Sequence, residues 1–136
     1  MKRRVILSFS LGLLLAVGLL WAPIASAGSG SFTGAWTALD EPGDGSIQVL
    51  TIGTGPRPGV VYQDLFASVC ASAGSASTHF RAVGAGELDG DVLVVEFPHG
   101  GGCGAFRLDP GVFEFTYDPE TDTLFDGMFT WTRLGS

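Results

Sequence analysis

Two cysteines and two histidines are the side chains of this sequence with the clearest potential for covalent or metal-ligand chemistry. Cys70 and Cys103 are the only cysteines, and His79 and His99 lie between them. The four could form a Cys2His2 zinc site, but their spacings of 9, 20 and 4 residues match no familiar zinc pattern. In an oxidising compartment an even pair of cysteines is typical of a disulfide. We therefore predict a Cys70–Cys103 disulfide, which would contribute about 3.8 kcal/mol by constraining the unfolded chain.

Acidic residues gather in two predicted turns, where they could bind calcium. Asp40 and Asp44 lie in the first turn, and Asp118 and Asp122 lie in the second. Calcium takes carboxylate oxygens from within one loop, but neither turn follows the EF-hand spacing. Aspartate also favours turns because its side chain accepts hydrogen bonds from its own backbone. We favour this second interpretation, and the sequence predicts no metal and no other cofactor.

No catalytic constellation is recognisable in the sequence. It contains neither G-x-S-x-G nor H-E-x-x-H, which mark two common kinds of hydrolytic site. Three acids, Asp64, Glu96 and Glu114, fall outside the turns, and we expect them to face solvent or to pair with Arg81 or Arg107. The sequence therefore predicts a protein that is not an enzyme.

The first 27 residues have the features of an export signal. A basic start is followed by an apolar run over residues 5–21, then by Pro23 and by an A-x-A cleavage motif at 25–27. We predict that residues 1–27 form a signal peptide that is removed. The remaining chain, residues 28–136, is then a single domain, secreted or periplasmic, with no membrane span.

The predicted mature chain is strongly acidic. After cleavage it keeps four arginines and no lysine against all fourteen acids, which gives a formal net charge of −10. Polyanions bind to clustered cations, and the four arginines are scattered singly along the chain. This excludes nucleic acid and anionic membrane surfaces as expected partners. A small apolar molecule or an extracellular protein remains.

Short β-forming segments separated by turn residues fill the mature chain, which indicates an all-β fold. The connections are short, so sequential antiparallel pairing is expected. We predict a small antiparallel up-and-down β-barrel, with a β-sandwich as the alternative. The predicted strands are 31–39, 46–52, 59–66, 78–83, 87–88, 91–97, 103–108, 112–117 and 127–134. The segment 62–74 contains about one helical turn of apolar spacing and is equally well read as a strand.

The two ends of the mature chain carry a resemblance to a known group of barrels. The opening "FTGAW" and the ending "FTWTR" resemble the first and last strands of calycins, the group that includes lipocalins, fatty-acid-binding proteins and avidins. This resemblance implies that Arg133 packs over Trp36 and closes one end of a barrel. A guanidinium over an indole face contributes about 0.5 to 2 kcal/mol.

A second likeness, to small exported bacterial β-domains of unknown function, covers most of the mature chain. It rests on an opening Trp36 and Asp44-Gly45-Ser46, on a Y-x-D strand (Tyr62 and Asp64) and on the two cysteines. This likeness implies no activity.

Alternation along the predicted strands places aromatic side chains on the inner face of the barrel. A non-covalent ligand would then contact Trp36, Tyr62, Phe113, Phe115 and Trp131, with Arg133 closing the base. The sequence predicts a barrel that holds a small apolar ligand. The alternative is a structural or interaction domain whose aromatic residues fill the core.

Overall fold

The computed structural model describes residues 29–74 and 79–135, and the chain there is almost entirely β-structure. The predicted signal peptide, residues 1–27, lies outside the described residues. None of the helices in the described segments is long and apolar enough to cross a membrane.

Ten strands and two short helices make up the described chain. The helices are α1 (Ser29–Phe32) and α2 (Ser68–Ser72). The strands are β1 (Gly34–Leu39), β2 (Ile47–Ile52), β3 (Gly59–Leu65), β4 (His79–Asp89), β5 (Val92–Phe97), β6 (Gly101–Cys103), β7 (Phe106–Leu108), β8 (Gly111–Asp118), β9 (Thr123–Phe125) and β10 (Thr130–Arg133).

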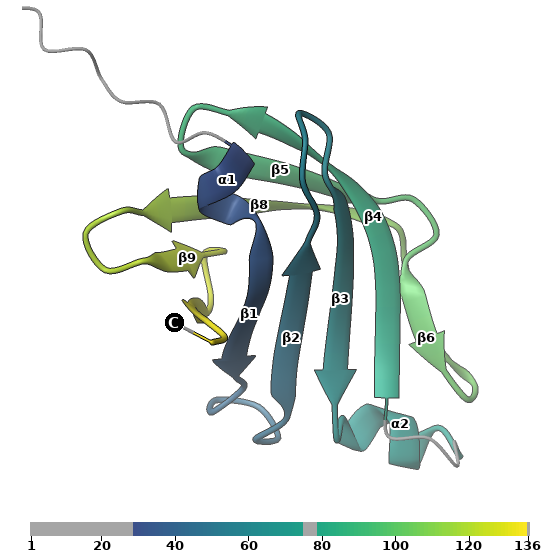
Figure 1. The fold of residues 1–136 in the computed structure, drawn as a ribbon. Helices are drawn as coiled ribbons and strands as arrows, with labels where there is room; N and C mark the ends of the chain where they lie inside the picture. The colour runs from purple at the N-terminus through teal and green to yellow at the C-terminus, as the bar shows by residue number, and fades with distance from the viewer. Residues whose placement is uncertain (1–28, 75–78, 136) are drawn as a thin grey trace, which may run out of the picture.

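Eight of these strands close into an antiparallel barrel, which confirms the predicted architecture and excludes the sandwich. The strand order follows the chain from β1 through β5 to β8, β9 and β10, and β10 pairs back with β1. β6 and β7 form a hairpin outside the ring, attached to β4. Figure 1 shows β1 to β4 side by side along the front and β5 and β8 crossing behind them. Closure removes the exposed strand edges that an open sheet would present.

Several predicted boundaries were wrong for local reasons. The two strands predicted over 78–83 and 87–88 are, within the described residues, one strand, β4, which begins at His79 and pairs with β3 through its first half and with β5 through its second. The segment 103–108 is a hairpin, not one strand, because Gly104 turns the chain at a positive φ of 56°. The segment 62–74 is divided between the end of β3 and α2. β9 was not predicted, and the strand expected over 127–134 begins only at Thr130.

The two ends of the barrel differ in construction. At one end, which we call the closed end, Phe32, Trp36, Tyr117, Asp122 and Arg133 pack together, with α1 beside the start of β1 (Figure 1). The other end, which we call the open end, is formed by the connections 40–46 and 126–129, by α2 and by the β6–β7 hairpin. Between the two ends the barrel holds one core of buried apolar side chains, among them Leu50, Val60, Leu93, Val95 and Leu124.

The predicted disulfide is confirmed, and it lies at the open end. Cys70 on α2 is bonded to Cys103 on β6, so the bond joins the helix after β3 to the hairpin outside the ring. Gly101 allows β6 to lie close to β4, since a Cβ there would meet the Arg81 carbonyl oxygen and the Phe80 ring at 2.6 Å. The glycines of this segment therefore supply the room that the backbone needs beside β4.

Candidate functional site

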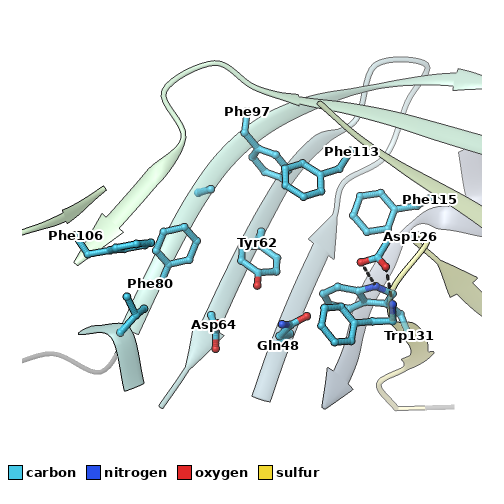
Figure 2. Close-up of a pocket in the computed structure, with 13 residues that line it drawn as sticks. Gln48, Tyr62, Asp64, Phe80, Phe97, Phe106, Phe113, Phe115, Asp126 and Trp131 are labelled. Atoms are coloured by element: carbon cyan, nitrogen blue, oxygen red, sulfur yellow. Dashed lines mark hydrogen bonds between the residues drawn. The ribbon is translucent and has the colours of Figure 1, made fainter. Parts of the chain in front are cut away.

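An aromatic cavity of about 290 Å³ occupies the open end of the barrel. Strands from most of the ring contribute to it, together with α2 and β7 (Figure 2). The rings of Phe80, Tyr62, Trp131 and Phe115 form a chain of edge-to-face contacts along the wall, with centroid separations of 5.8, 6.2 and 6.0 Å. The lining residues are Gln48, Tyr62, Asp64, Val69, Phe80, Ala82, Phe97, Phe106, Phe113, Phe115, Asp126, Phe129 and Trp131.

The aromatic side chains reach the cavity because of strand alternation, as the sequence predicted for several of them. Phe113 and Phe115 point inward from β8, and Tyr62 points inward from β3 (Figure 2). Trp131 is buried on β10 and shares its inner face with Phe129 and Arg133. Alternate residues of a strand lie on the same face of the sheet, so the polar residues between them face outward.

Two polar side chains lie opposite each other on the cavity wall. Gln48 of β2 and Asp64 of β3 are directly paired in the antiparallel register, which brings their Cβ atoms to about 5 Å. Gln48 is only 4% exposed, and its Oε1 atom has no hydrogen-bond partner. The Oδ1 atom of Asp64 and the hydroxyl of the adjacent Ser46 are also buried without a partner. An unpaired buried polar atom costs about 1 to 3 kcal/mol, so these three oxygen atoms destabilise the folded protein when nothing donates a hydrogen bond to them.

The position of Asp64 corrects the expectation that its side chain faces solvent or pairs with an arginine. It shares the inner face of β3 with Val60 and Tyr62 and lines the cavity (Figure 2). Desolvation is the main cause that raises the pKa of Asp64, and the negative charges of Asp44 and Asp40 raise it further, whereas the nearby Ser46 hydroxyl lowers it. Glu96 and Glu114 are exposed on the outer face, as expected for them.

Asp126 is the second carboxylate on the cavity wall, and unlike Asp64 it is fully engaged. One oxygen accepts hydrogen bonds from the backbone N–H groups of Met128 and Phe129, at 2.9 and 2.7 Å. The other accepts the indole N–H of Trp131 at 3.0 Å (Figure 2). Asp126 therefore positions Trp131 and Phe129 on the wall, and we assign it a structural role.

Trp36 and Arg133 lie at the closed end and not on the cavity lining. The guanidinium carbon of Arg133 lies 4.0 Å from the centroid of the Trp36 ring, which confirms the stacking that the resemblance to calycins implies. Arg133 also donates two hydrogen bonds of 2.8 Å to the carboxylate of Asp122 and further bonds to the carbonyl oxygens of Thr33 and Ser31. These bonds lower the pKa of Asp122.

The glycine before Trp36 is required by the same contacts. Gly34 has a φ of +131°, a conformation that residues with a side chain rarely adopt, and a Cβ at this position would lie 3.2 Å from Nη1 of Arg133. The indole N–H of Trp36 donates to the Phe32 carbonyl oxygen at 2.8 Å. The Gly-x-Trp sequence at the start of β1 therefore provides the surface against which the Arg133 side chain packs.

The four aspartates considered as calcium ligands have other partners. Asp40 and Asp118 accept hydrogen bonds from backbone N–H groups of their own turns, as the alternative interpretation expects. Asp44 accepts the N–H of Ser68 at the start of α2 and that of Ser46, which lowers its pKa. Within residues 29–74 and 79–135, no group of three or more His, Cys, Asp or Glu side chains is placed to hold a metal ion.

Four of the six predicted ligand-contacting residues therefore line the cavity, Tyr62, Phe113, Phe115 and Trp131, and the other two form the closed end. Sequence reasoning missed Gln48, Asp64, Phe80 and Phe97. Alternation could have found them, since each lies two residues from a side chain with an inward position. Comparison with protein-family models, with curated proteins and with solved structures gives no significant match.

Proposed function

We propose that this protein is an exported binding protein that holds a small, largely apolar molecule in the open end of its barrel. The observation that carries the proposal is the cavity itself, which has a volume of about 290 Å³ and a wall made mostly of aromatic side chains. Ligand pockets in proteins begin at about this size, roughly 300 Å³. A molecule with one or two rings would match the space.

The distribution of packing supports binding at this end. Trp36, Leu50 and Leu93 are fully buried in the core below the cavity, so the barrel is filled there. Phe113, by contrast, is 41% exposed at the cavity although it belongs to the inner face of β8. Large aromatic side chains normally bury most of their surface. A bound apolar ligand would complete the burial of this one.

An extracytoplasmic location forms part of the proposal. The Cys70–Cys103 disulfide supports it, because such bonds persist in oxidising compartments and are rare in the cytosol. The activity that we propose is non-covalent binding without a chemical step.

The experiment uses a neutral, polarity-sensitive dye, N-phenyl-1-naphthylamine, titrated into the folded protein at pH 7. We expect saturable dye fluorescence and a change in tryptophan emission, which arises from Trp131 because that indole lines the cavity. Ala82→Phe should abolish both signals, since Ala82 points into the cavity from β4.

Val83→Phe is the matched control, because Val83 is the next residue of β4 and is exposed on the outer face. Circular dichroism and thermal unfolding establish that both variants are folded. Saturable dye binding that Ala82→Phe removes and Val83→Phe preserves would support the proposal. No saturable binding by the wild-type protein would instead favour the structural or interaction domain with a filled core.

A further inference from the structure

The polar side chains on the cavity wall, Gln48 and Asp64, restrict the kinds of ligand that can bind there. Gln48 Oε1 and Asp64 Oδ1 are both hydrogen-bond acceptors, they belong to directly paired positions of β2 and β3, and neither atom accepts a hydrogen bond in the structure. The hydroxyl of Ser46 is the donor that lies near Asp64, and it lowers the pKa of that carboxyl. A ligand that satisfies both must bring at least two N–H or O–H groups to one point. A protonated amine has three donors and no acceptor, so it matches this pair.

The electrostatic surroundings also favour a cation. The described residues that line the cavity include no arginine, lysine or histidine, whereas Asp64 and Asp126 both belong to the lining. The charges of Asp64, Asp40, Asp126 and Asp44 all raise the pKa of Tyr62, after burial as the main cause, so a negative potential reaches across the wall. Arg133 is engaged at the opposite end by Asp122.

The aromatic part of the wall is compatible with the same ligand. Tyr62 and Phe80 lie beside the acceptor pair. Tyr62 is two residues from Asp64 on β3, and Phe80 is the residue of β4 that pairs with Asp64. Aromatic rings attract ammonium groups electrostatically and also bury the apolar body of a ligand. Figure 2 shows Gln48 and Asp64 at one side of the cavity and Phe97, Phe113 and Phe115 at the other.

We propose that the ligand of this cavity is a small aromatic or otherwise apolar amine, bound as a cation with its ammonium group between Gln48 and Asp64 and its ring among the aromatic side chains. This inference rests on the proposed binding function and specifies its ligand class. Because the ammonium group and the Asp64 carboxylate would both be charged, the hydrogen bonds between them would be charge-assisted.

Isothermal titration calorimetry with three ligands of one shape tests the proposal. Tryptamine carries an ammonium group, tryptophol carries a neutral hydroxyl in its place, and indole-3-acetate carries a carboxylate. We expect tryptamine to bind at least about tenfold more tightly than tryptophol, as a charge-assisted bond at a buried site should. Indole-3-acetate should bind most weakly.

Asp64→Asn should reduce the preference for tryptamine over tryptophol to less than about threefold while leaving tryptophol affinity unchanged. Glu96→Gln is the matched control, because it removes one negative charge from the outer face of β5 and should keep the full preference. Gln48→Leu is a second variant that removes the other acceptor and should weaken tryptamine more than tryptophol.

The outcomes separate this inference from the function on which it rests. If tryptophol bound to the wild-type protein as tightly as tryptamine, the proposal of an amine ligand would be wrong, but the proposed binding of an apolar molecule would still hold. Equal losses in Asp64→Asn and Glu96→Gln would show a general charge effect and overturn the assigned contact. Failure of all three ligands and of the neutral dye would overturn both proposals.

Discussion

The two ends of this barrel contain similar side chains but treat their polar atoms in opposite ways. At the closed end Arg133 and Tyr117 donate hydrogen bonds to Asp122, and Arg133 and Trp36 donate further bonds to backbone carbonyl oxygens of α1. At the open end Gln48 keeps a buried oxygen without a partner, and so do the neighbouring Ser46 and Asp64.

The difference is the one we expect if the closed end serves stability and the open end serves the binding that we propose. Buried polar atoms in native proteins are nearly always paired, and each exception needs a reason. The closed end follows the rule. The open end concentrates its exceptions at one cavity, as expected of a site whose remaining hydrogen bonds come from a ligand. Its rim is held instead by the Cys70–Cys103 disulfide and by Asp44, which binds the start of α2.

Replacing the disulfide by Cys70→Ala and Cys103→Ala together should have the largest effect on stability. The bond spans 33 residues of sequence, and its loss should lower the free energy of unfolding by about 3.8 kcal/mol on chain-entropy grounds. Urea denaturation gives this value. Hydrogen exchange should show that α2 and the β6–β7 hairpin lose protection before the closed end does.

Ser72→Ala, an exposed change on the same helix, controls for perturbation of α2 itself and should leave stability nearly unchanged. If the double variant instead lost protection first at β1 and β10, the conclusion that the disulfide stabilises the open end would be wrong.

Arg133→Met should come next, with a loss of about 3 kcal/mol. The change keeps the apolar stem but removes every donor, so the Asp122 carboxylate and the carbonyl oxygens of Ser31 and Thr33 lose their partner. The Arg133 side chain is 21% exposed, which keeps the cost at the lower end of the range for buried pairs. Thermal and urea unfolding measure it.

Arg81→Met is the control for Arg133→Met, since Arg81 is exposed on β4 and should change stability by no more than about 0.5 kcal/mol. The folded Arg133→Met protein should still bind the neutral dye, because Arg133 does not line the cavity. Loss of dye binding without loss of stability would mean that the two ends are not separate in function.

The closed end and the fold were largely readable from the sequence, because they depend on local signals. Turn residues and alternation predicted most of the strands, and the resemblance of two short segments at the chain ends to those of calycins implied that Arg133 packs over Trp36. β9 was missed because Thr123–Phe125 lies among aspartate, proline and threonine residues that favour turns. α1 was missed because its four residues carry too little periodicity to distinguish them from the strand that follows.

The open end was only partly readable, because its polar residues depend on register. Alternation from Tyr62 places Asp64 inside the barrel, but its charge favoured an outward assignment, since carboxylates are seldom buried. Alternation from Leu50 places Gln48 inside the barrel as well, but a neutral amide at an inward position does not by itself indicate a binding role. It becomes informative only when the pairing of β2 with β3 brings it opposite Asp64, and the pairing of individual residues between strands is not visible in a single sequence.

The smallest expected effects come from removing one carboxylate charge at each end, and they should have opposite signs. Asp64→Asn should raise the stability of the ligand-free protein by up to about 1 kcal/mol, because the partly exposed carboxylate is desolvated without a partner. Asp122→Asn should lower it, because Arg133 then loses the charge that accepts two of its hydrogen bonds. Urea denaturation at pH 7 compares the two variants with the wild-type protein.

The pH dependence of these two differences sharpens the contrast between the ends. The pKa of Asp64 is raised in the folded protein, so its ionisation costs stability above that pKa, and the cost disappears as the pH falls toward the unfolded value of about 3.9. The pKa of Asp122 is lowered, so its contribution is present above about pH 3.9 and is lost only as the pH falls below it. The gain from Asp64→Asn should therefore vanish between neutral pH and about pH 4, where the loss from Asp122→Asn is still nearly complete. If the gain in stability from Asp64→Asn persisted below pH 4, the carboxylate charge would not be its cause. The open end would then not differ from the closed end by an unpaired charge.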